Sequence, residues 1–290
     1  MSPDLALRSR AAYLLVRDQG GVLAGYSAAE LLGAGCAPAT AAAEVLVGRN
    51  NRAHPGLLVR RGQAADADVV EAAGIRVTSP ARTAWDLARR LPPVEAAVAL
   101  DALARVGGFA PDELLDRRAA EPGTRGSRGV AEVVGLADPR AESVRESRLR
   151  LGLVRAGLPA PRVQHVVRDD RGFLLARVDL AYPDAMLALE CDDSAAFDVR
   201  QMLRERQRDA LLAGYGWVTL RLVPDEVGVG ILQTAHRVQG LLARRRGLGG
   251  GPGVPSVPGG SGMLVGPGDP APGPAERGPS VPGAAVGSAG

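Results

Sequence analysis

The chain has 290 residues, 46% of them hydrophobic, so it can bury a substantial core and is long enough for two domains. All 35 basic residues are arginines, which excludes any mechanism that needs a catalytic lysine, and a formal net charge of +3 lends only weak support to nucleic-acid binding. Cys36 and Cys191 are too few for a disulfide framework or a zinc cluster.

Hydropathy and the N-terminal residues predict a cytoplasmic protein. No apolar run approaches the roughly 20 residues that a membrane helix needs. The N-terminus also lacks the basic, apolar and small-residue order of a secretory signal. We therefore expect no membrane partner.

Residues 1–116 are predicted to form a mixed α/β domain that opens with two helices. The first is expected at 8–19, and the run Tyr26–Gly33 predicts the second. Glu30 follows Ser27 by three residues, which is the pattern of a capping box. Two short helices with a Gly-containing turn are compatible with a winged helix-turn-helix. An ordinary helical pair explains the pattern equally well, because the second helix offers few side chains that read bases.

Strands and two more helices are expected in the rest of this domain. Short β-branched runs bounded by Gly, Pro or Asn predict strands at 44–49, 57–61 and 75–78. Ser79-Pro80 then opens a helix to Arg89, and residues 94–104 predict another.

A second domain is predicted at 140–246, after a linker at 117–139 whose Gly and Pro residues break any periodicity. Its expected order is a helix, three strands, a polar helix, a strand and a helix. From residue 247 to 290 the composition is dominated by Gly, Pro, Ser, Ala and Val. This segment cannot bury enough surface to offset its ordering entropy, so we expect a disordered C-terminal tail.

Three carboxylates mark two successive strands of the second domain. Alternation places Arg177 and Asp179 on one face, opposite Val178 and Leu180. On the next strand, Glu190 and Asp192 share the face opposite two leucines. If the strands pair, the carboxylates of Asp179, Glu190 and Asp192 converge, as a hard cation such as Mg²⁺ requires. A solvated sheet edge is the plainer alternative.

The ordered motifs of residues 140–225 resemble a nuclease family. They include Glu146-Ser147, Gly157-Leu158-Pro159, Arg177-Val178-Asp179-Leu180, Glu190-Cys191-Asp192 and Gly216-Trp217. Together they resemble domains of uncharacterised actinobacterial proteins related to the very-short-patch-repair endonucleases, in the restriction-endonuclease-like PD-(D/E)xK superfamily. The resemblance implies a mixed sheet with flanking helices. It also implies that Glu146, Asp179 and Glu190 bind Mg²⁺ and that Asp179, Glu190 and Asp192 are catalytic.

The sequence departs from that family at positions that matter for cleavage. Asp192 stands where the superfamily usually has a lysine, and it cannot supply positive charge. Asp193 replaces the usual glycine, and alanine occupies the usual histidine position. These departures favour a weakened or lost activity. The sequence therefore supports two functions: metal-dependent phosphodiester hydrolysis with a degenerate site, or a non-catalytic DNA-binding or toxin–antitoxin-type regulator that retains the nuclease fold.

The N-terminal half resembles a different family. The runs Ser27–Gly33 and Thr78–Ala88 are similar to the antitoxin and regulator family of abortive-infection toxin–antitoxin systems. This resemblance is compatible with DNA as a partner.

The polar helix at 197–213 carries candidate DNA contacts. Arg200, Arg204 and Arg208 recur at four-residue spacing, so they share a helix face and could contact phosphates. A solvated face with Glu205 and Asp209 interleaved explains the same pattern. The alternation of the strand does not decide which side of the sheet His165 faces. Trp217 is expected in the core.

Overall fold

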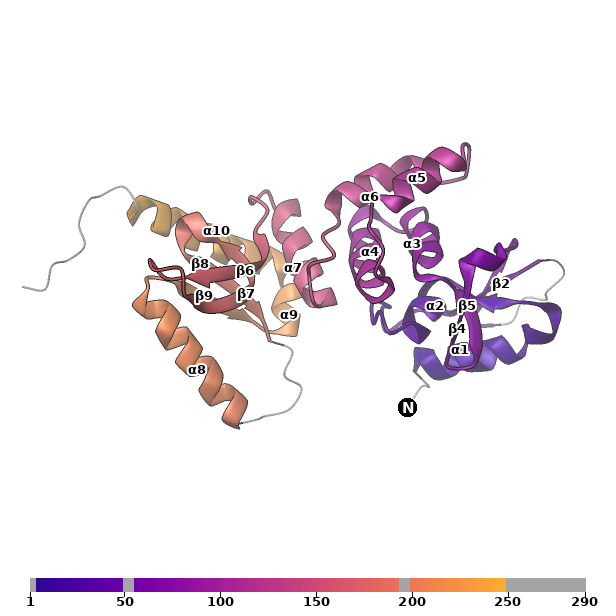
Figure 1. The fold of residues 1–290 in the computed structure, drawn as a ribbon, viewed down its shortest axis with the longest axis horizontal. Helices are drawn as coiled ribbons and strands as arrows, with labels where there is room; N and C mark the ends of the chain where they lie inside the picture. The colour runs from indigo at the N-terminus through magenta and orange to yellow at the C-terminus, as the bar shows by residue number, and fades with distance from the viewer. Residues whose placement is uncertain (1–3, 49–54, 193–198, 249–290) are drawn as a thin grey trace, which may run out of the picture. The chain divides into compact units, whose positions relative to one another are not determined.

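The structure, a computed structural model, describes residues 4–48, 55–192 and 199–248. It contains two mixed β-sheets with flanking helices, which confirms the predicted mixed α/β class (Figure 1). Asp193, the alanines that follow it, and almost all of the predicted tail lie outside the described residues. Among the helices of the described residues, none has the length and apolar character to span a membrane.

The first sheet has five strands in the order β3-β2-β1-β5-β4, and both parallel and antiparallel pairs occur. Its strands are β1 (Val22–Leu23), β2 (Ala43–Val47), β3 (Leu57–Arg61), β4 (Val69–Ala72) and β5 (Ile75–Thr78). The three predicted strands are present, and the short β1 and β4 were not predicted. Strand β2 is buried along its whole length, so it forms the centre of a small core with β1 and β5.

Helices α1 (Leu5–Leu14) and α2 (Gly25–Leu31) accompany this sheet. The predicted capping box at Ser27 is wrong, because Ser27 is the third residue of α2 and the N-cap is Ala24. The Ser27 hydroxyl instead accepts hydrogen bonds from the backbone N–H of Glu44 at 2.8 Å and from the Ser9 hydroxyl at 2.7 Å. Its role is to join α1, α2 and β2 inside the core.

A helical layer follows the first sheet and is centred on Trp85, which is 1% exposed. Its helices are α3 (Pro80–Ala88), α4 (Pro93–Gly107), α5 (Glu113–Ala120), η3 (Ser127–Gly129) and α6 (Val130–Leu136). Ser79 caps α3 as expected, since its hydroxyl accepts from the backbone N–H of Arg82.

The segment predicted as a linker, 117–139, is largely helical. Its Val130 and Val133 are fully buried against α4, and Leu114 of α5 joins the same core. Polar residues and turn-forming glycines dominate this segment, and only a few apolar residues at helical spacing reveal its packing. Residues 130–136 therefore pack onto the helical layer, and the domain boundaries stay a prediction.

The second sheet has four strands in the order β6-β7-β8-β9. They are β6 (Arg162–Arg168), β7 (Leu174–Tyr182), β8 (Leu187–Cys191) and β9 (Val218–Leu222). The antiparallel pairs β6–β7 and β7–β8 are followed by the parallel pair β8–β9, which requires the crossover through helix α8 (Val199–Gly214). The element order agrees with the sequence prediction.

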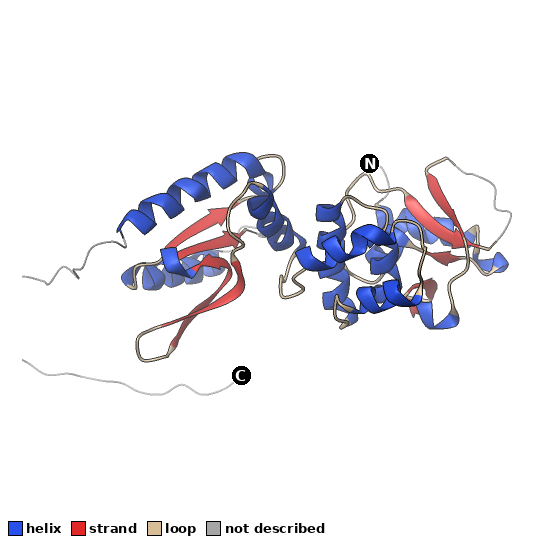
Figure 2. Cartoon of the chain, turned by 90° about the horizontal axis from the view of Figure 1, so that it is seen from above, coloured by secondary structure: helices blue, strands red, loops and turns tan. Residues whose placement is uncertain are grey.

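Helices cover both faces of the second sheet (Figure 2). Leucines of β7, β8 and β9 pack against α7 (Val144–Arg155), α9 (Pro224–Val227) and α10 (Ile231–Leu248). Leu212 of α8 packs on the other side, against Val178, Ala181 and Ala188. The parallel strand pair is therefore covered on both faces, as such pairs usually are.

Strand β7 does not alternate regularly. Val178 packs with Leu212 of α8, whereas Leu180 packs with α7 and α10, so the predicted common face of these two residues is wrong. The interruption falls at Asp179. On the neighbouring strand, Gln164 lies between the paired residues Val163–Leu180 and His165–Val178 and has a left-handed φ of 49°. Such strain in a non-glycine residue is kept only where the surrounding structure enforces it.

Candidate functional site: a carboxylate pocket

The carboxylates singled out by sequence line one pocket of the second sheet. Glu146, Asp179, Glu190 and Asp192 all border a cavity of about 540 Å³, together with Arg208 and Arg221. The side chains come from α7, β7, the end of β8, α8 and β9. The structure thus brings together residues that lie as much as 75 positions apart in the sequence, counted from Glu146 to Arg221.

Glu146 enters the pocket from the first turn of α7. Ser143 caps this helix by accepting a hydrogen bond from the backbone N–H of Glu146 at 3.1 Å. The Glu146 carboxylate accepts from the backbone N–H of Glu142 at 2.9 Å and from Gln164 Nε2 at 2.8 Å. Burial raises the pKa of Glu146, the bond from Glu142 opposes the rise, and the nearby Asp179 carboxylate adds to it. The strained residue Gln164 therefore positions this carboxylate.

Asp179 is held against the neighbouring strand. Its Oδ2 accepts a hydrogen bond from the backbone N–H of Cys191 at 2.9 Å. Strand β7 pairs with β8 only from Leu180 onward, so this side chain continues the connection where the backbone ladder ends. Asp179 and Glu190 consequently border the same space.

Glu190 is the most deeply buried of the pocket's acidic residues on the sheet, at 6% exposure. Its Oε2 accepts a hydrogen bond from Arg208, and Arg221 lies 3.8 Å from the same oxygen. Burial raises the pKa of Glu190, and the positive charge of Arg208 opposes that rise. Among the described residues, no group donates a hydrogen bond to Glu190 Oε1.

Arg221 is a pocket residue that the sequence prediction missed. It pairs with Glu190 in the parallel register of β8 and β9, and it binds Asp209 of α8 with two hydrogen bonds of 3.1 Å. A further contact of 3.2 Å joins Arg221 to Glu205. Opposite charges on adjacent strands are a signal for such a pair, but reading it requires the strand register.

Two relatives place the chain in a family. They are uncharacterised proteins of Mycobacterium tuberculosis, from strains CDC 1551 and H37Rv, and each is 35% identical to this chain over 192 residues. The aligned region is 66% of this chain and 70% of each relative. The chain belongs to the family of these mycobacterial proteins.

Residues 21–138 match a domain family of their own, the AbiEi antitoxin C-terminal domain. We refer to these residues as the AbiEi-type domain. The match confirms the expected abortive-infection antitoxin-like unit, and it ends at residue 138, after α6. The resemblance of residues 140–225 to repair endonucleases lies outside the matched range and stays a prediction. No solved structure shows detectable similarity to the chain.

The carboxylate pocket contains no preformed metal site among the described residues. Within residues 4–48, 55–192 and 199–248, no three His, Cys, Asp or Glu side chains lie close enough together to hold one. Oxygen donors of the right type line the pocket, and Glu190 Oε1 lacks a partner among the described residues. The neighbouring Oε2 is bound by a guanidinium group, so Arg208 supplies the positive charge beside Glu190.

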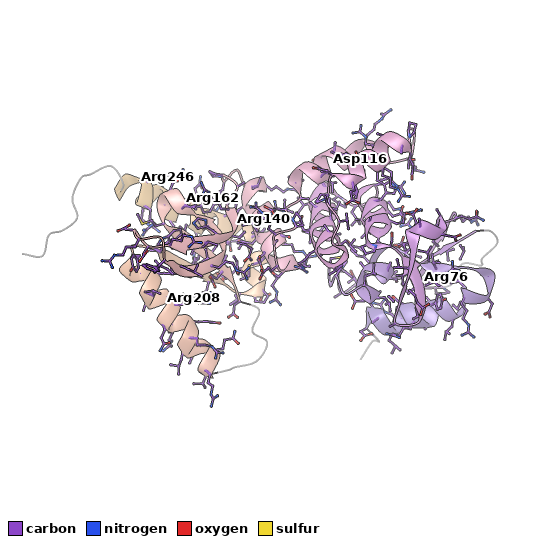
Figure 3. The ribbon with its side chains drawn as sticks, viewed as in Figure 1. Arg76, Asp116, Arg140, Arg162, Arg208 and Arg246 are labelled. Carbon is purple, nitrogen blue, oxygen red and sulfur yellow. The ribbon has the colours of Figure 1, made fainter. Side chains whose placement is uncertain are left out.

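The three arginines predicted to bind DNA have different surroundings. Arg208 of α8, which is labelled in Figure 3, lines the carboxylate pocket. Arg200 and Arg204 are exposed on the same helix, and their contact with phosphates stays a prediction.

His165 does not border the pocket, because its ring stacks on Trp217 with a centroid distance of 5.7 Å. Trp217, expected in the core, is only partly buried and packs on the α8 side of the sheet.

Proposed function

We propose that the protein is a DNA-binding regulator of the toxin–antitoxin type, in which the second domain retains a nuclease-like pocket without cleaving DNA. The observation that carries this proposal is the match of residues 21–138 to the AbiEi antitoxin C-terminal domain. The packing of α5 and α6 onto the Trp85 core supports it, because the last helices of the matched range share one core with α3 and α4.

The chemistry of the carboxylate pocket favours the non-catalytic form. Asp192 contributes negative charge where the nuclease superfamily usually has a lysine, and Glu190 is already paired with Arg208. Six carboxylate side chains border the pocket against two arginines, so its excess negative charge repels a phosphodiester. We therefore expect other surfaces of the chain to bind DNA.

DNA binding can be measured by fluorescence anisotropy with the full chain and labelled duplexes at several salt concentrations. We expect salt-dependent affinity that is retained in Asp179→Ala and in Glu190→Gln, because the proposed binding does not use the pocket. Absence of affinity at low salt would overturn the proposal.

Metal-dependent phosphodiester hydrolysis is the second candidate function. It is favoured by the convergence of Glu146, Asp179 and Glu190 on one cavity and by Glu190 Oε1, which has no hydrogen-bond partner among the residues that the structure describes. Nicking of supercoiled plasmid in Mg²⁺ or Mn²⁺ tests it, with Asp179→Ala as the control. Nicking by the wild type above the level of this control would support hydrolysis, and equal rates would eliminate it.

A further inference from the structure

A second cavity, in the AbiEi-type domain, shares no lining residue with the carboxylate pocket. It has a volume of about 920 Å³ and is formed by α5 and the loop that leads into η3. Three arginines and two hydroxyl groups line it, and none of its lining residues is acidic: Arg118, Arg125, Arg128, Thr124 and Ser127 provide the polar groups.

The arginines of this cavity differ from their neighbours in their pairing. Arg117, one residue before Arg118, binds Asp68 with two hydrogen bonds of 2.7 Å and also binds Glu121. Arg89, at the end of α3, binds Asp86. In contrast, no ion pair between described residues involves Arg118, Arg125 or Arg128. Within the described residues, their guanidinium groups are therefore not paired with a carboxylate.

The loop that carries the hydroxyls is held in one conformation. Gly126 has a φ of 83°, and a Cβ on it would lie 2.2 Å from the backbone oxygen of Arg89. The Arg89 guanidinium also donates a hydrogen bond of 3.0 Å to the backbone oxygen of Arg125. Within the loop, Ser127 N donates to Thr124 O at 3.1 Å. The loop is thus fixed against the end of α3 before any ligand arrives, which lowers the ordering cost of binding.

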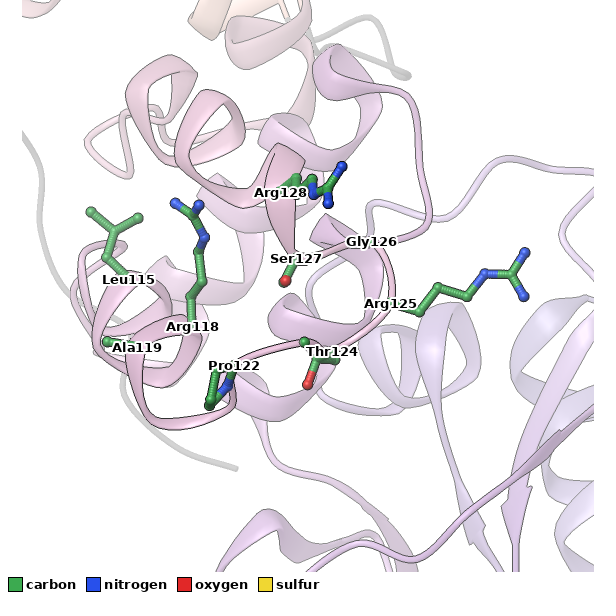
Figure 4. Close-up of a pocket in the computed structure, with 10 residues that line it drawn as sticks. Leu115, Arg118, Ala119, Pro122, Thr124, Arg125, Gly126, Ser127 and Arg128 are labelled. Atoms are coloured by element: carbon green, nitrogen blue, oxygen red, sulfur yellow. The ribbon is translucent and has the colours of Figure 1, made fainter.

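We propose that this cavity binds a phosphate group. Arginine guanidinium groups and Ser or Thr hydroxyls are the side chains that commonly contact phosphate oxygens. Figure 4 shows Arg118 on α5 and Arg128 at the end of the loop that bears Thr124 and Ser127, whereas Arg125 points away from both. We therefore assign the charge contacts to Arg118 and Arg128 and the neutral contacts to the two hydroxyls.

The phosphate can come from a DNA backbone or from a small ligand such as a nucleotide. The DNA source rests on the proposed function, and the small-ligand source does not. Both predict that loss of Arg118 and Arg128 removes binding, and neither requires the carboxylate pocket.

The test compares two charge-matched double variants of the full chain. Arg118→Ala/Arg128→Ala removes the proposed contacts. Arg61→Ala/Arg162→Ala removes two other exposed arginines, from β3 and from β6. The probes are a short fluorescent DNA duplex and fluorescent ATP, each titrated at several salt concentrations. All four side chains are exposed, so both variants should fold, which circular dichroism checks.

If the phosphate belongs to DNA, the first variant should bind the duplex on the order of tenfold more weakly than the control variant. Its slope of log affinity against log salt should be smaller by about 1, because loss of the contact with one phosphate removes about one unit. If the phosphate belongs to a small ligand, ATP binding should be lost in the first variant alone.

Other outcomes separate this inference from the proposed function. Equal loss of duplex binding in both double variants, with no effect on ATP, would overturn the site while leaving DNA binding intact. ATP binding that depends on Arg118 and Arg128, in a protein without duplex affinity, would support the site and overturn the proposed function. No binding of either probe by the wild type would overturn both.

Discussion

Arg208 of α8 donates a hydrogen bond to Glu190 of β8 and thereby pairs a positive charge with a carboxylate that is 6% exposed. The two residues are 18 positions apart, and the crossover helix brings them together. Because Arg221 approaches the same oxygen, the second sheet and α8 are joined by charge as well as by apolar packing. This pairing ties the stability of the second domain to the chemistry of its pocket.

Replacement of Arg208 by alanine should destabilise the protein by about 2–3 kcal/mol. The change leaves a buried carboxylate without its principal partner, and the cost is below that of a fully buried pair because the Arg208 side chain is 31% exposed. Urea unfolding near neutral pH measures the loss.

Arg204→Ala is the matched control, since Arg204 lies one helical turn away on the same helix and is exposed. Its effect on stability should stay within about 0.5 kcal/mol. Equal destabilisation by the two variants would show that the contact with Glu190 has no special importance.

The pocket should make stability depend on pH through Glu146. Burial raises the pKa of this carboxyl above its usual 4.5, so the folded protein binds the proton more tightly than the unfolded chain does. Unfolding free energy must therefore fall as the pH rises from about 4.5 through the raised pKa of the folded state. Glu190 and Asp101 contribute in the same direction, because burial also raises the pKa of each.

Glu146→Gln should reduce this fall, because the amide does not titrate and its oxygen can still accept a hydrogen bond. Urea unfolding at a series of pH values compares the variant with the wild type. Glu142→Gln, an exposed neighbour on the rim, is the control and should retain the wild-type slope. A wild-type slope in Glu146→Gln would contradict the assigned pKa shift.

The sequence was informative where local signals and packing agree. Ser79-Pro80 predicted the start of α3, because the cap and the fixed φ of proline act within a few residues. Strand β1 escaped notice because it contains only two residues. Ser27 misled the prediction because its hydroxyl binds Glu44 across the core instead of capping α2.

For the carboxylate pocket, the sequence indicated which residue types line the cavity, but it did not indicate which side chains contact one another. Asp179 and Glu190 stood out through their strands, and the structure places both at the same cavity. Arg208 was assigned to DNA because its four-residue spacing describes only its helix face, whereas its contact depends on the β8–α8–β9 crossover. The interruption of alternation at Asp179 also depends on the neighbouring strand, where Gln164 adopts its left-handed conformation.

Asp101 of α4 and Arg150 of α7 should show a large coupling energy. Asp101 accepts hydrogen bonds from Arg150 at 2.8 Å and from Ser147 at 2.7 Å, and it is 1% exposed. Asp101→Ala should lower the free energy of unfolding by about 3–5 kcal/mol, because it leaves the buried guanidinium group of Arg150 without its carboxylate partner. In a double-mutant cycle, adding Arg150→Ala to Asp101→Ala should restore part of the lost stability. Urea unfolding measures the free energy of unfolding of each variant.

The matched control for this cycle joins the same two helices at the surface. Glu95 of α4 and Arg148 of α7 are 3.3 Å apart, with side chains 44% and 34% exposed. Their coupling should be below about 1 kcal/mol, as in most exposed ion pairs. Similar coupling energies in the two cycles would mean that burial does not strengthen the Asp101 contact.

The loop of the proposed phosphate site offers two glycines that separate backbone strain from steric conflict. Gly123 and Gly126 have φ values of 80° and 83°, so alanine at either position is strained. A Cβ at Gly123 meets nothing within 4 Å, whereas one at Gly126 would lie 2.2 Å from the Arg89 backbone oxygen. Gly123→Ala should lower the free energy of unfolding by about 1 kcal/mol and Gly126→Ala by distinctly more, as measured by urea unfolding.

Only Gly126→Ala should also weaken binding of the phosphate-bearing probe, because the loop must move away from α3. Equal effects of the two alanines on stability and binding would show that the contact with Arg89 does not fix the loop.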